Sequence, residues 1–134
     1  SIPCNNKMEK EGLYMSFSSL SEYISSLGDK EKEYILRFIN LMENEYPNLK
    51  LRFSFSMPMW WFKDKMRDGY VGVSATKSRF TLHVSSESYV KDIEKERPEL
   101  KYGKQCVSIS YKREDDFLFL QKKAKEFISI NVDQ

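Results

Sequence analysis

The chain has 134 residues, of which 40% are hydrophobic and 31% charged, with a net charge of +2. This length and composition predict one ordinary globular domain with its own core. The weak net charge argues against a nucleic-acid partner, and the longest apolar run, Met57 to Phe62, is far shorter than the ~20 residues of a membrane span. We therefore expect a soluble cytoplasmic protein with neither a nucleic acid nor a membrane as its partner.

The N-terminal segment, residues 1–17, is polar and aperiodic, and we interpret it as a tail before a single domain over residues 18–130. Cys4 lies in this tail, and the only other cysteine is Cys106. A structural bridge between them is not expected, because a loose tail does not hold a cysteine in bonding geometry. The pattern favours reduced thiols in a cytosolic compartment.

Two helices open the domain. Ser19-Leu-Ser-Glu22 fits a capping box and predicts a short helix to about Leu27, stopped by Gly28. Asp29 is placed to cap a second, longer helix that Pro47 ends. The apolar residues of this helix recur at helical spacing: Tyr34, Ile35, Phe38, Ile39, Leu41, Met42 and Tyr46.

Strands come next. Leu49 to Ser56 alternates between apolar and polar residues, which predicts a half-buried strand. Pro58 has no N–H to give a ladder, so we expect the strand to end, bulge or lie at an edge there, before a second apolar piece from Met59. Tyr70 to Thr76 and Arg79 to Val84 alternate on either side of two residues, Lys77 and Ser78, as a hairpin does.

The remaining pattern predicts a helix over residues 86–97, a strand over 105–111 and a last helix over about 114–129. Most strands alternate, which is typical of an antiparallel sheet with one face covered. The predicted fold class is therefore α+β, with two layers: an antiparallel sheet of about five strands and helices packed on one of its faces.

Alternation also predicts which residues each face carries. The residues expected to point at the helices are Phe53, Phe55, Val71, Val73, Phe80, Leu82, Val107 and Ile109. The opposite face is mostly small and polar: Arg52, Ser54, Ser56, Tyr70, Gly72, Ser74, Thr76, Arg79, Thr81, His83, Cys106, Ser108 and Ser110. Neighbours on a strand point opposite ways, so either Trp60 or Trp61 belongs to this face as well.

Three interpretations of that face stay open: an ordinary solvated surface, a shallow binding surface, or a face covered by the tail or by a second copy of the chain. For a binding surface, small residues would leave space and an aromatic rim would hold a ligand. Met57 and Met59, beside the tryptophans, suit an apolar ligand. The candidate ligand-binding residues are Trp60, Trp61, Tyr70, Arg79, His83 and Cys106.

Catalytic and metal-binding patterns are sparse. His83 is the only histidine, and a pair with Cys106 is geometrically conceivable, but nothing in the sequence activates the thiol, so we predict no catalytic site. No zinc-ligand spacing is present. Hard cations could bind carboxylates such as Asp29, Glu31 and Glu33, although the lysines between these acids are typical of a solvated, ion-paired helix face.

Short motifs add a family resemblance. Residues 53–60, FSFSMPMW, match an I-S-Y-x-M-P-x-F segment, His83-Val84 matches the start of an H-I-x-x-Y strand, and Tyr102-Gly103-Lys104 matches a Y-x-x-G-K element. In this order along residues 18–127, the chain resembles the YdhG-like family, a domain of unknown function whose members are often described as frataxin-like intracellular iron chaperones.

The resemblance implies a frataxin-like α+β fold, a non-enzymatic role and iron as a cofactor or cargo. Relatives often carry an acid just before the Ile-Ser-Tyr segment, where this chain has Leu51 and Arg52, and their tyrosine is Phe55 here. If that acid binds iron, this chain lacks it. The alternative is a module that binds a small molecule, a peptide or a protein partner on the open sheet face around Tyr70 and His83, as a monomer or homodimer.

Overall fold

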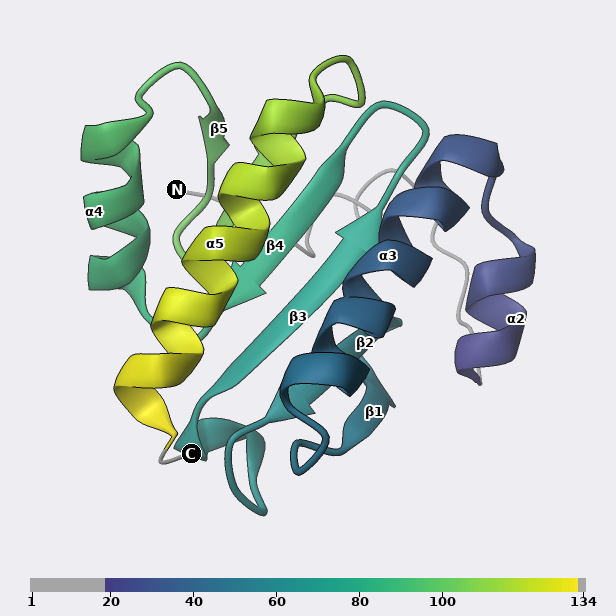
Figure 1. The fold of residues 1–134 in the computed structure, drawn as a ribbon, viewed down its shortest axis with the longest axis horizontal. Coiled ribbons are helices and arrows are strands. Elements are labelled where there is room, and N and C mark those ends of the chain that lie inside the picture. The colour runs from purple at the N-terminus through teal and green to yellow at the C-terminus, as the bar shows by residue number, and fades with distance from the viewer. Residues whose placement is uncertain (1–18, 133–134) are drawn as a thin grey trace.

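Two long helices lie across one face of a β-sheet in the computed structural model, which describes residues 19–132. Figure 1 shows these helices, α3 (Asp29–Glu45) and α5 (Glu114–Asn131), in front of the sheet, with the shorter α2 (Leu20–Ser25) and α4 (Glu87–Glu96) at its flanks. None of the helices described is long and apolar enough to cross a bilayer.

The sheet has six strands in the order β1-β2-β3-β4-β6-β5, and every neighbouring pair is antiparallel. The strands are β1 (Leu51–Ser54), β2 (Met57–Trp61), β3 (Tyr70–Ala75), β4 (Phe80–Val84), β5 (Lys101–Tyr102) and β6 (Cys106–Ile109). A 3₁₀ turn, η1 (Met66–Asp68), leads into β3. The predicted two-layer α+β fold is confirmed, with one strand more than the expected five.

Aromatic rings hold the two layers together. Tyr34 of α3 and Phe117 of α5 lie 4.3 Å apart, centroid to centroid, and both pack against Phe80 of β4. Phe38 packs against Trp60 at 5.7 Å. Burying one such ring stabilises the fold by roughly 1.5–3 kcal/mol, so this cluster decides which sheet face the helices cover.

The helix starts follow capping rules, with one correction. The Ser19 hydroxyl accepts a hydrogen bond from the Glu22 amide at 3.1 Å, as predicted. Gly28, not Asp29, is the N-cap of α3, and the Glu31 carboxylate accepts the Gly28 amide at 3.0 Å. This is one half of a capping box, and the other half is missing because Gly28 has no side chain to accept an amide of the first turn.

The predicted strand over residues 49–56 is in fact the first half of a hairpin. β1 ends at Ser54, which pairs with Met57, and the turn between them is Phe55-Ser56 with φ of 54° and 59°. Two left-handed residues are the pattern of a type I′ turn. The prediction that Phe55 faces the core is therefore wrong: the turn takes it out of the alternation, and it is 62% exposed.

Pro58 also departs from the expectation, because β2 runs through it and continues to Trp61. On one side Pro58 is the partner of Phe53, while on the other the ladder between β2 and β3 begins only at Met59. Ser54 and Met57 close the two-residue turn, and the next pair, Phe53 and Pro58, does not exchange backbone hydrogen bonds. The nitrogen of Pro58 therefore faces β3, at a position before the β2–β3 ladder begins, so no ladder hydrogen bond is lost.

The left-handed turn predicts a stabilising substitution. Ser56→Gly should raise the free energy of unfolding by about 1 kcal/mol, because glycine adopts positive φ without the steric cost of a Cβ. Urea denaturation followed by tryptophan fluorescence measures the change. Ser78→Gly is the matched control, because it lies in the other two-residue turn, where φ is not in the left-handed region. Equal effects of the two substitutions would contradict the strain argument.

Candidate functional site

The candidate site is the sheet face turned away from α3 and α5, which we call the second face. Trp60 packs on Phe38 and is 1% exposed, so its neighbours Met59 and Trp61 point the other way. The residues paired across the strands at this level are Arg52, Met59, Gly72, His83 and Cys106. Two residues further along each strand, the next row of paired residues on this face is Ser54, Met57, Ser74, Thr81, Ser108 and Lys101.

Most of the predicted ligand-binding residues share the second face. Register places Trp61 opposite Tyr70, and His83 opposite Cys106. Arg79 precedes Phe80, whose ring faces the helices, so alternation turns Arg79 toward the second face. Trp60 does not belong to the face, because it is part of the core.

His83 is buried, which contradicts the expectation of a wet, open position. Its side chain is 5% exposed, and its Nε2 lies 2.8 Å from the Ser74 hydroxyl. Gly72, its partner in β3, leaves space that methionines fill: Met57 Sδ and Met59 Cγ both lie 3.2 Å from the place of a Cβ at residue 72. Burial lowers the His83 pKa to about 4, so the imidazole is neutral near pH 7.

Cys106 is also buried, with 5% exposure, and it is disulfide-bonded. The expectation of a reduced thiol is therefore wrong for this residue, while Cys4 lies outside the described residues. A nucleophilic cysteine must be a free thiolate. The conceivable pair of Cys106 with His83 thus lacks its nucleophile here, although the two residues are direct partners across β4 and β6.

Arg52 and Trp61 form a stacked pair at one corner of the second face. The guanidinium carbon lies 4.3 Å from the centroid of the indole ring, which is close enough for a cation–π interaction. The Arg52 Nε and the Trp61 Nε1 are both buried, and neither has a hydrogen-bond partner within residues 19–132. A buried N–H left without an acceptor costs about 1–3 kcal/mol, so this corner favours a ligand that brings acceptor oxygens.

Polar pairs occupy the rest of the face. The Tyr70 hydroxyl donates to the Gln105 side-chain oxygen at 3.2 Å, and the Thr81 and Ser108 hydroxyls lie 2.7 Å apart. Burial raises the pKa of Tyr70, so its hydroxyl stays protonated. The charged residues that the described strands and their ends present here are Arg52 of β1, Arg79 just before β4, and Lys101 of β5. All three are basic, so the electrostatic potential of the face favours an anion.

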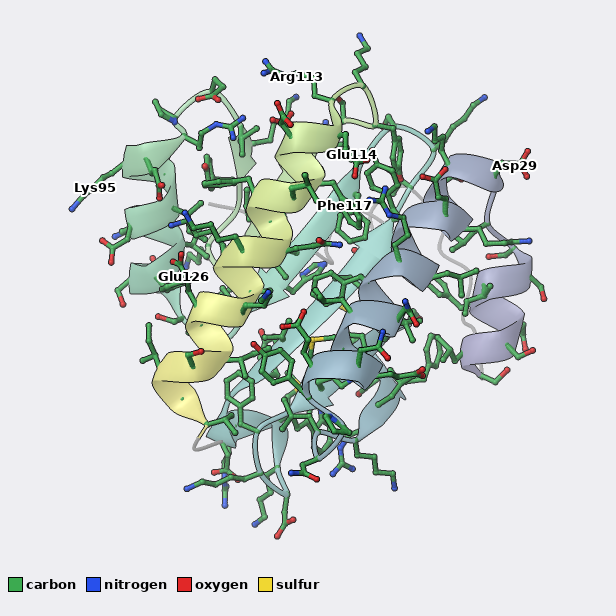
Figure 2. All side chains as sticks on the ribbon, in the orientation of Figure 1. Asp29, Lys95, Arg113, Glu114, Phe117 and Glu126 are labelled. Carbon is green, nitrogen blue, oxygen red and sulfur yellow. The ribbon has the colours of Figure 1, made fainter. Side chains whose placement is uncertain are left out.

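The acids predicted as metal ligands are spread along the start of α3, and two of the three, Glu31 and Glu33, have other partners. Glu31 accepts the Gly28 amide, and Glu33 forms ion pairs with Lys30 at 3.6 Å and Arg37 at 3.4 Å. Within residues 19–132, no group of three or more His, Cys, Asp or Glu side chains is arranged to hold a metal ion. Figure 2 labels Asp29 at the outer end of α3, far from the sheet. Iron binding stays a prediction.

Sequence reasoning placed Arg52 on this face but missed it as a site residue. Its importance comes from Trp61, which stacks on it across the β1–β2 hairpin. Leu51 pairs with Trp60, and Arg52 with Met59, so Arg52 and Trp61 are diagonal neighbours. The two residues become neighbours only through this hairpin, which is hard to recognise from the sequence because its turn, Phe55-Ser56, contains neither glycine nor asparagine.

Comparisons with known proteins place the fold. Neither the family profiles nor the curated protein sequences contain a match to this chain. Among solved structures, a DUF1801 family protein, YdhG from Bacillus subtilis, superposes with a TM-score of 0.65 at 22% identity, over 82% of this chain and 87% of that one. The chain therefore has a YdhG-like fold, and its frataxin-like, iron-chaperone character stays a prediction.

Because the buried imidazole of His83 resists protonation, we predict that the free energy of unfolding decreases in acid. The unfolded chain binds a proton at His83 near pH 6.5, whereas the folded chain does so only near pH 4. Stability therefore falls as the pH drops from 6.5 to 4, by up to about 3 kcal/mol for this group. Urea unfolding at pH 7.5, 6, 5 and 4 should show a smaller acid loss in His83→Gln than in the parent chain. Superimposable pH profiles would refute a neutral, buried His83.

Proposed function

We propose that this protein is a non-catalytic binding module that holds a small carboxylate-bearing molecule with an apolar body on the second face. The observation that carries the proposal is the pair of buried, unpartnered donors, Arg52 Nε and Trp61 Nε1, at one corner of the face. A carboxylate has two acceptor oxygens and would satisfy both donors once the Arg52–Trp61 stack opens, because neither donor atom is accessible in this structure. Arginine is the side chain best matched to that geometry.

The surroundings of this corner support the same class of ligand. The charged strand residues of the face are basic, so they attract a carboxylate and repel a cation. Met57 and Met59 are 3% and 2% exposed and fill the space beside Gly72, so they form a packed apolar floor under this part of the face rather than a surface that the ligand touches. Trp61 and Tyr70 are half-buried partners in register and provide aromatic surface.

The chemistry of His83 supports binding rather than catalysis. Its Nε2 and the Ser74 hydroxyl have the spacing of a base and a nucleophile. However, a general base works best when its pKa is near the working pH, and burial lowers this pKa to about 4. No carboxylate within residues 19–132 is hydrogen-bonded to the imidazole to orient it or raise its basicity.

Benzoate and benzamide test the proposal, because they share a ring and differ in charge. Titration followed by tryptophan fluorescence should show saturable binding of benzoate that weakens with salt, and at least tenfold weaker binding of benzamide. Arg52→Met should reduce benzoate affinity at least tenfold, since it keeps the apolar stem and removes the donors. Lys95→Met, a charge removal on the outer face of α4, is the matched control. Equal affinities in the two variants would overturn the proposal.

Iron binding, implied by the family resemblance, has its own test. Ferrous and ferric iron titrated under anaerobic and aerobic conditions should shift the amide resonances around Asp29, Glu31 and Glu33 if these acids hold the metal. Glu31→Gln and Glu33→Gln together should then remove the shifts, whereas Glu43→Gln on the same helix should not. No saturable shift at ~100 μM iron, a result that excludes a dissociation constant below that concentration, would remove iron from the function.

A further inference from the structure

A hollow lies away from the second face, at one end of the sheet, and we call it the end pocket. Three segments meet there: the turn from η1 into β3, the start of α4 and the last turn of α5. The pocket has a volume of about 410 Å³, which is within the range of small-molecule sites. Its principal lining residues are Arg67, Ser86, Tyr89, Asp92, Phe127 and Asn131.

The apolar wall of the end pocket is aromatic and fixed in place. The rings of Tyr89 and Phe127 lie 4.8 Å apart, and Phe127 also packs on Phe62 at 5.7 Å. The Tyr89 hydroxyl donates to the Lys123 carbonyl at 2.8 Å, which ties α4 to α5. Phe127 is 4% exposed and supports the wall from behind, so the half-buried Tyr89 ring is the aromatic surface that a planar ligand can contact, and aromatic contacts of this kind contribute about 0.5–1.5 kcal/mol beyond area burial.

The loops around the pocket are held by local constraints, so the hollow is preformed. Gly69 has φ of +115°, and a Cβ there would lie 2.7 Å from the Phe62 ring, so only glycine fits. The Ser85 hydroxyl accepts the Tyr70 amide at 3.0 Å and joins the two loops. Because these loops are already fixed, binding a ligand costs less conformational entropy.

The rim is polar, and its charge selects among ligands. The Ser86 hydroxyl caps α4 by accepting the Tyr89 amide at 3.1 Å and lies 3.2 Å from the Ser88 hydroxyl. The charged lining residues are one cation, Arg67, and two anions, Asp68 and Asp92. Two carboxylates against one guanidinium leave the rim side chains with a net negative charge, which the partial positive charge of the α4 N-terminus, about half a unit, offsets only in part. The rim therefore disfavours a phosphorylated ligand and favours a neutral one that donates hydrogen bonds.

We infer that the end pocket binds an uncharged, planar heterocyclic compound of nucleoside type. The ring would lie against Tyr89 and the exposed Ile130, while hydroxyl and amino groups would contact Ser86, Asp92 and Asn131. The pocket lining includes neither Arg52 nor Trp61, so the site is separate from the one proposed above. Its ligand differs in charge as well as in place.

Adenosine, its 5′-monophosphate and glucose are the probes. Adenosine titrated into the labelled protein should give saturable amide shifts at Ser86, Tyr89 and Asn131. The monophosphate should bind at least fivefold more weakly, and glucose, which is polar but not planar, should give no shifts. No shift at the solubility limit of adenosine, shifts confined to the second face, or tighter binding of the monophosphate would each overturn the inference.

Variants separate this site from the proposed carboxylate site. Ser88→Phe fills the pocket mouth from an exposed position on α4 and should weaken adenosine binding at least tenfold. Ser21→Phe, on an exposed position of α2, is the matched control and should leave binding unchanged. Arg52→Met should not alter adenosine affinity. Unchanged adenosine binding in Ser88→Phe, with an unchanged melting temperature, would refute the site.

Discussion

The contact between Phe80 of β4 and the rings of Tyr34 and Phe117 is the interaction on which the rest of this structure depends. It joins both long helices to the middle of the sheet, at centroid distances of 5.7 Å and 5.2 Å. Arg37 strengthens it, because its guanidinium lies 4.6 Å from the Phe117 ring and pairs with Glu114. Once Phe80 points at the helices, strand alternation assigns every neighbouring side chain to the core or to the second face.

That dependence explains how much of the fold could be predicted. Period-two patterns in β3, β4 and β6 and helical spacing in α3 and α5 are strong signals, because one buried face imposes them. The β1–β2 hairpin was missed because Phe55 and Ser56 take a left-handed turn that normally selects glycine or asparagine. The continuous alternation through Ser56 concealed a reversal of chain direction.

The site could be predicted only in part, for a related physical reason. Alternation assigns Trp61, Tyr70 and His83 to one face, but burial depends on what neighbouring strands place beside each residue. His83 is buried beside Gly72, where Met57 and Met59 fill the space, and this neighbourhood depends on strand order and register. The end pocket is harder still to predict from the sequence, because the residues that line it, such as Arg67, Ser86 and Phe127, are far apart in the chain.

The order of the strands affects how copies of this protein can associate through the edges of their sheets. The outermost strands are β1, with four residues, and β5, with two, so the sheet offers few free backbone groups along its borders. Natural β proteins use short border strands to prevent one sheet from extending into the next. Growth of this sheet into a continuous intermolecular ribbon is therefore disfavoured by its architecture, and any self-association would rely on side-chain surfaces instead.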